Sequence, residues 1–266
     1  MWNTNIDKAI DTQKKYTNDF TNYINELRDR AGDNMLDEFS RLRQFSLQTI
    51  KEQGIFYIGD ATEMLIPSYI DRVESFGVIS PTNKKPIFHN RYVIPIRDEN
   101  NNVLNVVGYS KEADERYVYG TSKYYRRRDT MYGLENLKLA YELGYAILTE
   151  GITDAIRLRD MGYKNTFANC GTHKSDFIMK QLDRCRYGVL KVPDRDAAGL
   201  RASKKWKCNR SITLNTHVMF KDVDEMCGYD DEMKSIVDEH IKLCIEWLKQ
   251  KEHQGKNHGE YIISIE

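Results

Sequence analysis

Apolar residues recur at three- and four-residue steps through the first fifty residues, which is the spacing of an amphipathic helix. Phe20, Ile24 and Leu27 share one such face, and a second face begins after a polar break at residues 31–34. The N-terminal segment, residues 1–53, is therefore predicted to be helical. It carries no recognisable chemistry, so we expect it to have a structural or partner-binding role.

Short strand-like runs replace this pattern between residues 54 and 143. Two of them, residues 92–96 and 103–107, flank a polar turn and predict a β-hairpin. A further run at residues 55–58 precedes the hairpin, and residues 136–143 are typical of a short helix. We expect a small mixed α+β subdomain here.

From residue 144 strand-like and helix-like runs alternate, which indicates an α/β fold with a mainly parallel, doubly wound sheet. The predicted strands are residues 145–148, 165–168, 187–192 and 216–220, and the predicted helices are residues 153–161, 175–184, 197–208 and 231–251. The expected boundaries are an α/β domain over residues 144–228, flanked by helices, and a C-terminal helix and tail over residues 229–266.

Composition and charge narrow the class of protein. No run of about 18 apolar residues could span a membrane, and the N-terminus has no signal-peptide pattern, so we expect a cytoplasmic protein. The five cysteines form no CxxC pair, which argues against a structural zinc.

Net charge is zero, yet residues 116–128 hold five basic and no acidic residues, while residues 221–240 hold eight acidic residues against two lysines. This separation suits a protein that holds both phosphates and metal ions.

Acidic residues follow three of the predicted strands. They are Glu150 and Asp154, then Asp194 and Asp196, then Asp222 and Asp224. Carboxyl ends of parallel strands meet at one edge of a sheet, where close carboxylates repel one another unless a hard cation neutralises them. Each pair alone is well explained as a helix cap. The three pairs together predict a shared two-metal site for phosphoryl transfer, with Mg²⁺ or Mn²⁺ favoured over Zn²⁺ because no histidine lies beside them.

These motifs resemble the Toprim domain of DnaG-type primases, of type IA and II topoisomerases and of some nucleases. Residues 149–155 (TEGITDA) resemble its first motif, and residues 168–172 (ANCGT) resemble its turn of small residues after the second strand. Residues 194–199 (DRDAAG) resemble its DxD motif, and residues 221–225 (KDVDE) are similar to the primase segment KDPDE.

The upstream half resembles the polymerase core of DnaG-type bacterial and phage primases. Residues 91–98 (RYVIPIRD), 116–117 (RY) and 125–134 carry this likeness in collinear order. A topoisomerase would need a reactive tyrosine in a large separate domain, for which the chain has no room. The resemblance implies a primase catalytic core that lacks the zinc-binding ribbon and most of the helicase-binding domain, which fits a phage or mobile element acting in the host cytoplasm.

This resemblance implies template-directed synthesis of short RNA primers on single-stranded DNA by metal-dependent nucleotidyl transfer from ribonucleoside triphosphates. It implies that Glu150, Asp194 and Asp196 are catalytic and bind the metals, that Asp222 is a further ligand, and that Asp154 and Asp224 are orienting or alternative ligands. The residues expected to bind template or nucleotide are Arg91, Arg97, Arg116, Tyr117, Lys123, Arg126, Arg127 and Arg128. The interleaved tyrosines suit stacking on single-stranded bases. A replicative helicase and a separate zinc-ribbon subunit are candidate partners.

Two departures from the family pattern keep other functions open. Ser110 stands where the family usually has arginine, and Arg195 replaces the usual glycine inside DxD. A Toprim-type nuclease would use the same acids with water as the nucleophile. A non-catalytic homologue that binds DNA or a replication partner is the other alternative.

Overall fold

The chain forms two compact units in a computed structural model that describes residues 2–125, 127–170, 176–253 and 261–266. The first unit joins Met1–Leu42 to Ser46–Thr130, and the second joins Arg43–Phe45 to Met131–Glu266. Within the described residues, no helix is both long enough and apolar enough to cross a membrane.

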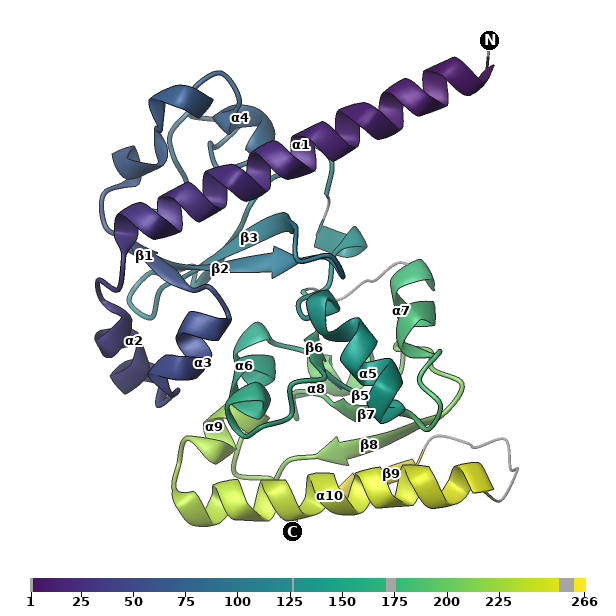
Figure 1. Ribbon diagram of the computed structural model, residues 1–266. Coiled ribbons are helices and arrows are strands. Elements are labelled where there is room, and N and C mark those ends of the chain that lie inside the picture. Colours follow the sequence, from purple (N-terminus) through teal and green to yellow (C-terminus); the bar gives the residue numbers. More distant parts are fainter. Residues whose placement is uncertain (1, 126, 171–175, 254–260) are drawn as a thin grey trace. The chain divides into compact units, whose positions relative to one another are not determined.

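The first unit is built on an antiparallel sheet with the strand order β1-β2-β3-β4 (Figure 1). Its strands are β1 (Phe56–Ile58), β2 (Arg91–Arg97), β3 (Val103–Tyr109) and β4 (Tyr117–Tyr119). β2 pairs with β3 from Tyr92 opposite Tyr109 to Arg97 opposite Val103, which confirms the predicted hairpin. Strand β4 was not predicted, because a run of three residues is too short to show a periodic pattern.

Helix α1 packs along this sheet with the face that its apolar spacing predicts. Phe20, Ile24 and Leu27 are buried there, and the ring of Phe20 lies 5.1 Å from that of Phe76. The helices of the unit are α1 (Trp2–Ala31), α2 (Leu36–Arg43), α3 (Leu47–Glu52) and α4 (Val73–Phe76). The break between α1 and α2 falls at the predicted polar residues, where Gly32 takes a positive φ of 59°.

The second unit contains a five-stranded, wholly parallel sheet with the order β6-β5-β7-β8-β9, which confirms the expected α/β class. Its strands are β5 (Tyr145–Thr149), β6 (Thr166–Ala168), β7 (Gly188–Val192), β8 (Ser211–Asn215) and β9 (Tyr261–Ser264). The edge strand β9 was not predicted. Three of its four residues are exposed, so it lacks the apolar run of a buried parallel strand.

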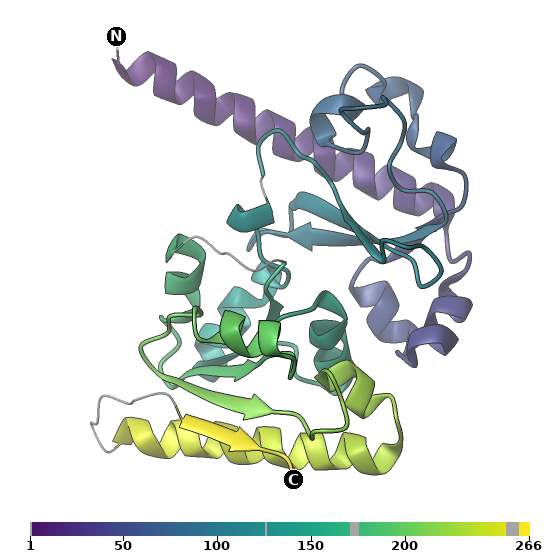
Figure 2. The ribbon, with the colours of Figure 1, turned by 180° about the vertical axis from the view of Figure 1, so that it is seen from behind.

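Helices cover both faces of this sheet (Figures 1 and 2). Helices α6 (Ile152–Asp160), α9 (Val223–Cys227) and α10 (Asp231–His253) pack on the face that carries Ile147 and Leu190. Helices α5 (Leu137–Leu143) and α7 (Asp176–Leu182) pack on the face that carries Leu148 and Val189, and α8 (Ala197–Ser203) connects β7 to β8. Since the central strands β5 and β7 are buried on both sides, their sequences consist mainly of apolar residues.

The predicted strand over residues 216–220 was wrong. The strand lies five residues earlier, at β8, where Ile212 and Leu214 are 0% and 1% exposed. Val218 and Met219 are instead 68% and 75% exposed, in a loop that follows the strand. Val218 and Met219 are apolar, as strand residues often are, but their side chains are not buried in the core. The predicted helix from residue 197 also ends early, at Ser203 rather than residue 208.

The corrected strand position predicts opposite outcomes for two truncations. Ile212→Ala should lower the free energy of unfolding by about 2–4 kcal/mol, because it leaves a cavity in the sheet core. Val218→Ala should change it by less than about 0.5 kcal/mol, because that side chain is exposed. Urea denaturation followed by circular dichroism measures both values. Equal losses for the two variants would contradict the assignment of β8 to Ser211–Asn215.

Candidate active site

Glu150 lies directly after β5 with a side chain that is partly buried. Its Oε2 atom is buried, and no hydrogen-bond donor among the described residues reaches it. Burial first, and then the charges of Asp194 and Asp196, raise the pKa of Glu150 to about 7. A buried acceptor without a partner, beside other carboxylates, is the environment that a hard cation stabilises.

The two acids of the DxD motif follow β7 and have different surroundings. Asp194 is largely buried, and its Oδ2 lies 3.0 Å from Lys221 Nζ. Burial raises the pKa of Asp194 although Lys221 opposes the shift. Asp196 is exposed and caps α8, since its Oδ1 accepts the N–H groups of Ala198 and Gly199 at 2.9 and 2.8 Å. These backbone bonds lower the pKa of Asp196.

Gly199 lets α8 begin close to Glu150. A Cβ atom at this position would lie 2.8 Å from Glu150 Oε2 and 2.4 Å from the Asp194 carbonyl oxygen. No side chain fits in that space, so the glycine keeps the acids of β5 and β7 in one cluster.

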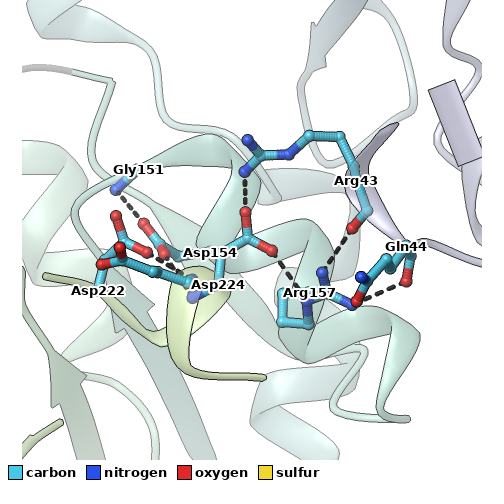
Figure 3. Close-up of polar contacts among 8 residues, drawn as sticks. Arg43, Gln44, Gly151, Asp154, Arg157, Asp222 and Asp224 are labelled. Carbon is cyan, nitrogen blue, oxygen red and sulfur yellow. Dashed lines mark hydrogen bonds and ion pairs between the residues drawn. The ribbon is translucent and has the colours of Figure 1, made fainter. Parts of the chain in front are cut away.

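Two further acids, Asp154 and Asp222, lie at the starts of the helices α6 and α9. Asp154 is buried in the first turn of α6, where its Oδ2 accepts the N–H of Gly151 at 3.2 Å and its Oδ1 accepts that of Asp224 at 3.1 Å (Figure 3). Burial and the charge of Asp222 raise the pKa of Asp154 well above its ordinary value. Asp222 caps α9 by accepting the N–H of Glu225 at 2.8 Å. Asp154 therefore joins α6 to α9, and Asp222 remains half-exposed at the start of α9.

Asp224 is held by two arginines and points away from this cluster. Its Oδ1 lies 2.8 Å from Arg157 Nε, and its Oδ2 pairs with the guanidinium of Arg43 (Figure 3). Arg157 also donates to the carbonyl oxygens of Gln44 and Arg43, at 2.8 and 2.5 Å. With both oxygens engaged by guanidinium groups, Asp224 is suited to fixing the chain rather than to direct metal binding.

Arg195 links the loop that follows β7 to the loop that follows β8. Its backbone N–H donates to the carbonyl oxygen of Lys221 at 2.7 Å, and its guanidinium donates to the carbonyl oxygen of Thr216. The arginine that departs from the family pattern therefore holds the loop after β8 against the DxD loop. Its chemical role could not be read from the sequence, because both partners are main-chain atoms.

By geometry alone, no group of three or more Asp, Glu, His or Cys residues in the described part of the chain is arranged as a metal site. The described residues nevertheless fit a hard divalent cation, since Glu150 Oε2 lacks a donor and the donor set consists of oxygens. Gly171 and Thr172, from the predicted small-residue turn, lie outside the described residues.

The basic residues predicted to bind template or nucleotide lie in the first unit, and several have partners there. Arg91 is buried and donates to the carbonyl oxygen of Arg116 at 3.2 Å, and burial lowers its pKa. Arg97 donates to the carbonyl oxygen of Asn101 at 3.3 Å. The side chains of Arg116, Lys123 and Arg127 are exposed, whereas Arg126 and the side chain of Arg128 lie outside the described part.

The tyrosines near these basic residues serve mainly to pack the first unit. The Tyr124 ring lies 4.5 Å from that of Tyr16, and the Tyr125 hydroxyl is 2.7 Å from that of Thr17. Tyr117 and Tyr119 in β4 are half-buried, and Arg127 covers the Tyr119 ring at 3.8 Å.

The raised pKa of Glu150 predicts a pH-dependent stability in the absence of metal. Between its ordinary value of 4.5 and about 7, the folded state binds more protons at this carboxyl than the unfolded state does. Stability should therefore fall as pH rises through this range. At pH 8 in EDTA, Glu150→Gln should be more stable than the parent chain by about 1 kcal/mol, after allowance for solvent screening, and at pH 4 the two should agree.

Glu246→Gln provides the matched control, because Glu246 is an exposed glutamate on α10. Its unfolding free energy, measured by urea titration across the same pH range, should follow that of the parent chain. A Glu150→Gln advantage that is the same at pH 4 and pH 8 would contradict the titration of this carboxyl.

The arginine pair on Asp224 predicts unequal costs for its two members. Arg157→Met should lower the free energy of unfolding by about 3–5 kcal/mol, because it leaves a buried carboxylate short of a partner. Arg43→Met should cost less, since the Arg43 side chain is 22% exposed against 3% for Arg157. Chemical denaturation of both variants measures the difference, and the reverse order would refute this account of the pair.

No protein-family profile matches the chain, whereas several curated relatives do. A DNA primase of Rickettsia bellii is 26% identical over 185 residues, which cover 64% of this chain and 31% of the relative. A DNA primase of Aquifex aeolicus is 30% identical over 146 residues, which cover 53% of this chain and 29% of the relative. The chain thus spans about a third of the length of these proteins.

Solved structures agree with these relatives. The zinc-binding and RNA polymerase domains of the Aquifex aeolicus primase match with a TM-score of 0.71 at 21% identity, over 85% of this chain and 60% of that one. The RNA polymerase domain of Mycobacterium tuberculosis DnaG, solved with a double-stranded DNA oligomer bearing a 6-nucleotide overhang, matches with a TM-score of 0.68 at 17% identity, over 84% of this chain and 80% of that one. The chain therefore has the fold of the catalytic core of DnaG-type DNA primases.

Proposed function

We propose that this chain is the catalytic core of a DNA primase, which joins ribonucleotides into short RNA primers on single-stranded DNA in the cytoplasm. The parallel-sheet unit is of the Toprim type in this proposal. The observation that carries it is the buried Oε2 of Glu150, which no donor in the described part of the chain reaches, beside the DxD acids at the carboxyl ends of β5 and β7. An acidic cluster with one unsatisfied oxygen suits metal-assisted phosphoryl transfer.

Each acid has a distinct role in this proposal. Glu150, Asp194 and Asp196 hold Mg²⁺ or Mn²⁺, with Asp222 as a further ligand. The bound metals would supply activation of a 3′-hydroxyl and neutralisation of the leaving pyrophosphate. Asp154 and Asp224 position the other acids, because their oxygens are engaged by backbone N–H groups and by arginines.

The exposed cations of the first unit would contact the phosphates of template and nucleotide. Arg116, Lys123 and Arg127 are exposed, whereas Arg91 and Arg97 have carbonyl partners that favour a supporting role. Phosphate contacts of this kind position single strands without reading their sequence. Arg126, Arg128 and Tyr117 are further proposed contacts for template or nucleotide, and a replicative helicase or a zinc-ribbon subunit is a proposed partner.

A nuclease is the second candidate, because cleavage would use the same acids with water as the nucleophile. The likeness to primases extends into the first unit, which a nuclease would not require, and this favours synthesis. A non-catalytic homologue would bind DNA yet neither join nor cleave nucleotides.

Incorporation of labelled ribonucleotides on single-stranded DNA with Mg²⁺ or Mn²⁺ tests the proposal. The chain should make short products, and Asp194→Ala should lower their rate at least about 100-fold, because losing a metal ligand removes several kcal/mol of transition-state stabilisation. Glu246→Gln should leave the rate unchanged. Products that survive Asp194→Ala would refute the assigned site. Strand cleavage without synthesis would identify a nuclease, and DNA binding without either reaction would identify a non-catalytic homologue.

A further inference from the structure

Lys221 forms an ion pair with Asp194, which is one of the proposed metal ligands. Its Nζ lies 3.0 Å from Asp194 Oδ2, and the side chain is 57% exposed. The contact joins the loop after β8 to the acid that follows β7. An ammonium group at hydrogen-bond distance from a carboxylate oxygen competes, by its charge and by the direction of approach that it fills, with a metal ion that would bind the same oxygen.

The backbone of Lys221 is fixed at both of its polar groups. Its N–H donates to Glu225 Oε2 at 2.6 Å, and its carbonyl oxygen accepts the N–H of Arg195 at 2.7 Å. The four-carbon side chain is therefore the part of the residue that can move while the loop stays in place. A lysine suits this task, because its charge is compact and its stem is flexible.

We propose that Lys221 is a built-in counter-ion that a divalent metal displaces from Asp194, and that the released ammonium then binds the triphosphate of the incoming nucleotide. The second part rests on the proposed primase function. The first part concerns only the metal and this chain. Lys221 thereby serves two states of the site, since its charge offsets the acids before the metal arrives and pairs with phosphate afterwards.

The strength of the contact fits such an exchange. Exposed ion pairs contribute about 0.2–1 kcal/mol, so displacing the ammonium weakens metal binding by no more than about fivefold. A metal ion and an ammonium within about 4 Å of each other repel, so the side chain leaves Asp194 once the metal is bound. Anionic phosphate oxygens at the same site offer it a new partner.

Manganese binding to the free protein tests the first part. Unbound Mn²⁺ is followed by electron paramagnetic resonance in a titration without DNA or nucleotide. Lys221→Gln should lower the Kd for Mn²⁺ about two- to fivefold, because the competing charge is gone. Lys207→Gln is the matched control, because Lys207 is exposed and precedes β8 at the opposite end of the sheet. This control should leave the Kd unchanged.

Nucleotide binding tests the second part. In saturating Mn²⁺, the Kd for a fluorescent ATP analogue should rise at least about fivefold in Lys221→Gln, be largely retained in Lys221→Arg, and stay unchanged in Lys207→Gln. Urea midpoints of all variants establish that they are folded.

The proposal therefore predicts that Lys221→Gln binds Mn²⁺ more tightly and the ATP analogue more weakly. If Lys221 only stabilised the fold, its loss would weaken the binding of both. Unchanged or weaker Mn²⁺ binding in Lys221→Gln would overturn the counter-ion role. Unchanged binding of the ATP analogue would overturn the phosphate role, as would its failure to bind the parent chain. Neither titration depends on primer synthesis, so a chain that makes no primers would refute the proposed function and leave the counter-ion result standing.

Discussion

Crowded negative charge at the carboxyl end of the parallel sheet is the constraint that organises the second unit. Most of the acids there are stabilised by neighbouring donors, in three different ways. Backbone N–H groups at the starts of α8 and α9 stabilise Asp196 and Asp222, and two guanidinium groups hold Asp224. An ammonium group pairs with Asp194. Glu150 alone among these has a buried oxygen left without a donor in the described structure, and the cluster is therefore incomplete at that atom.

Two of the acids, Asp154 and Asp224, hold elements of the second unit together. Asp154 and Asp224 are 4% and 5% exposed, and they join α6, α9 and residues 43–45 within the second unit. Burying the pair of Asp224 and Arg157 has a desolvation cost that its Coulomb attraction offsets only with good geometry and further hydrogen bonds. Those bonds are present, because Arg157 also donates to two carbonyl oxygens. Asp196 is exposed and Asp222 is half-exposed, so both residues are accessible to solvent.

The fold could be predicted from the sequence where the local apolar pattern and the order of strands and helices indicate the same arrangement. Alternation of strands and helices predicted the parallel sheet, and the acids after β5 and β7 could be assigned to its carboxyl edge from chain order alone. Prediction failed at residues 216–220, where the apolar side chains of Val218 and Met219 are exposed in a loop, and at β9, whose exposed residues give no strand signal. The arginines on Asp224 could not be predicted, because Arg157 is 67 and Arg43 is 181 residues away along the chain, and no local spacing relates them.

Arg195 has a consequence for how the site would meet its ligands. Because it bonds to two carbonyl oxygens of the loop after β8, the spacing between that loop and the DxD loop is fixed by the folded chain itself. The conformational entropy of the two loops is therefore lost during folding rather than at the moment of binding. A cation arriving at this edge would meet two loops whose spacing is already set, so that side chains rather than backbone would have to rearrange around it.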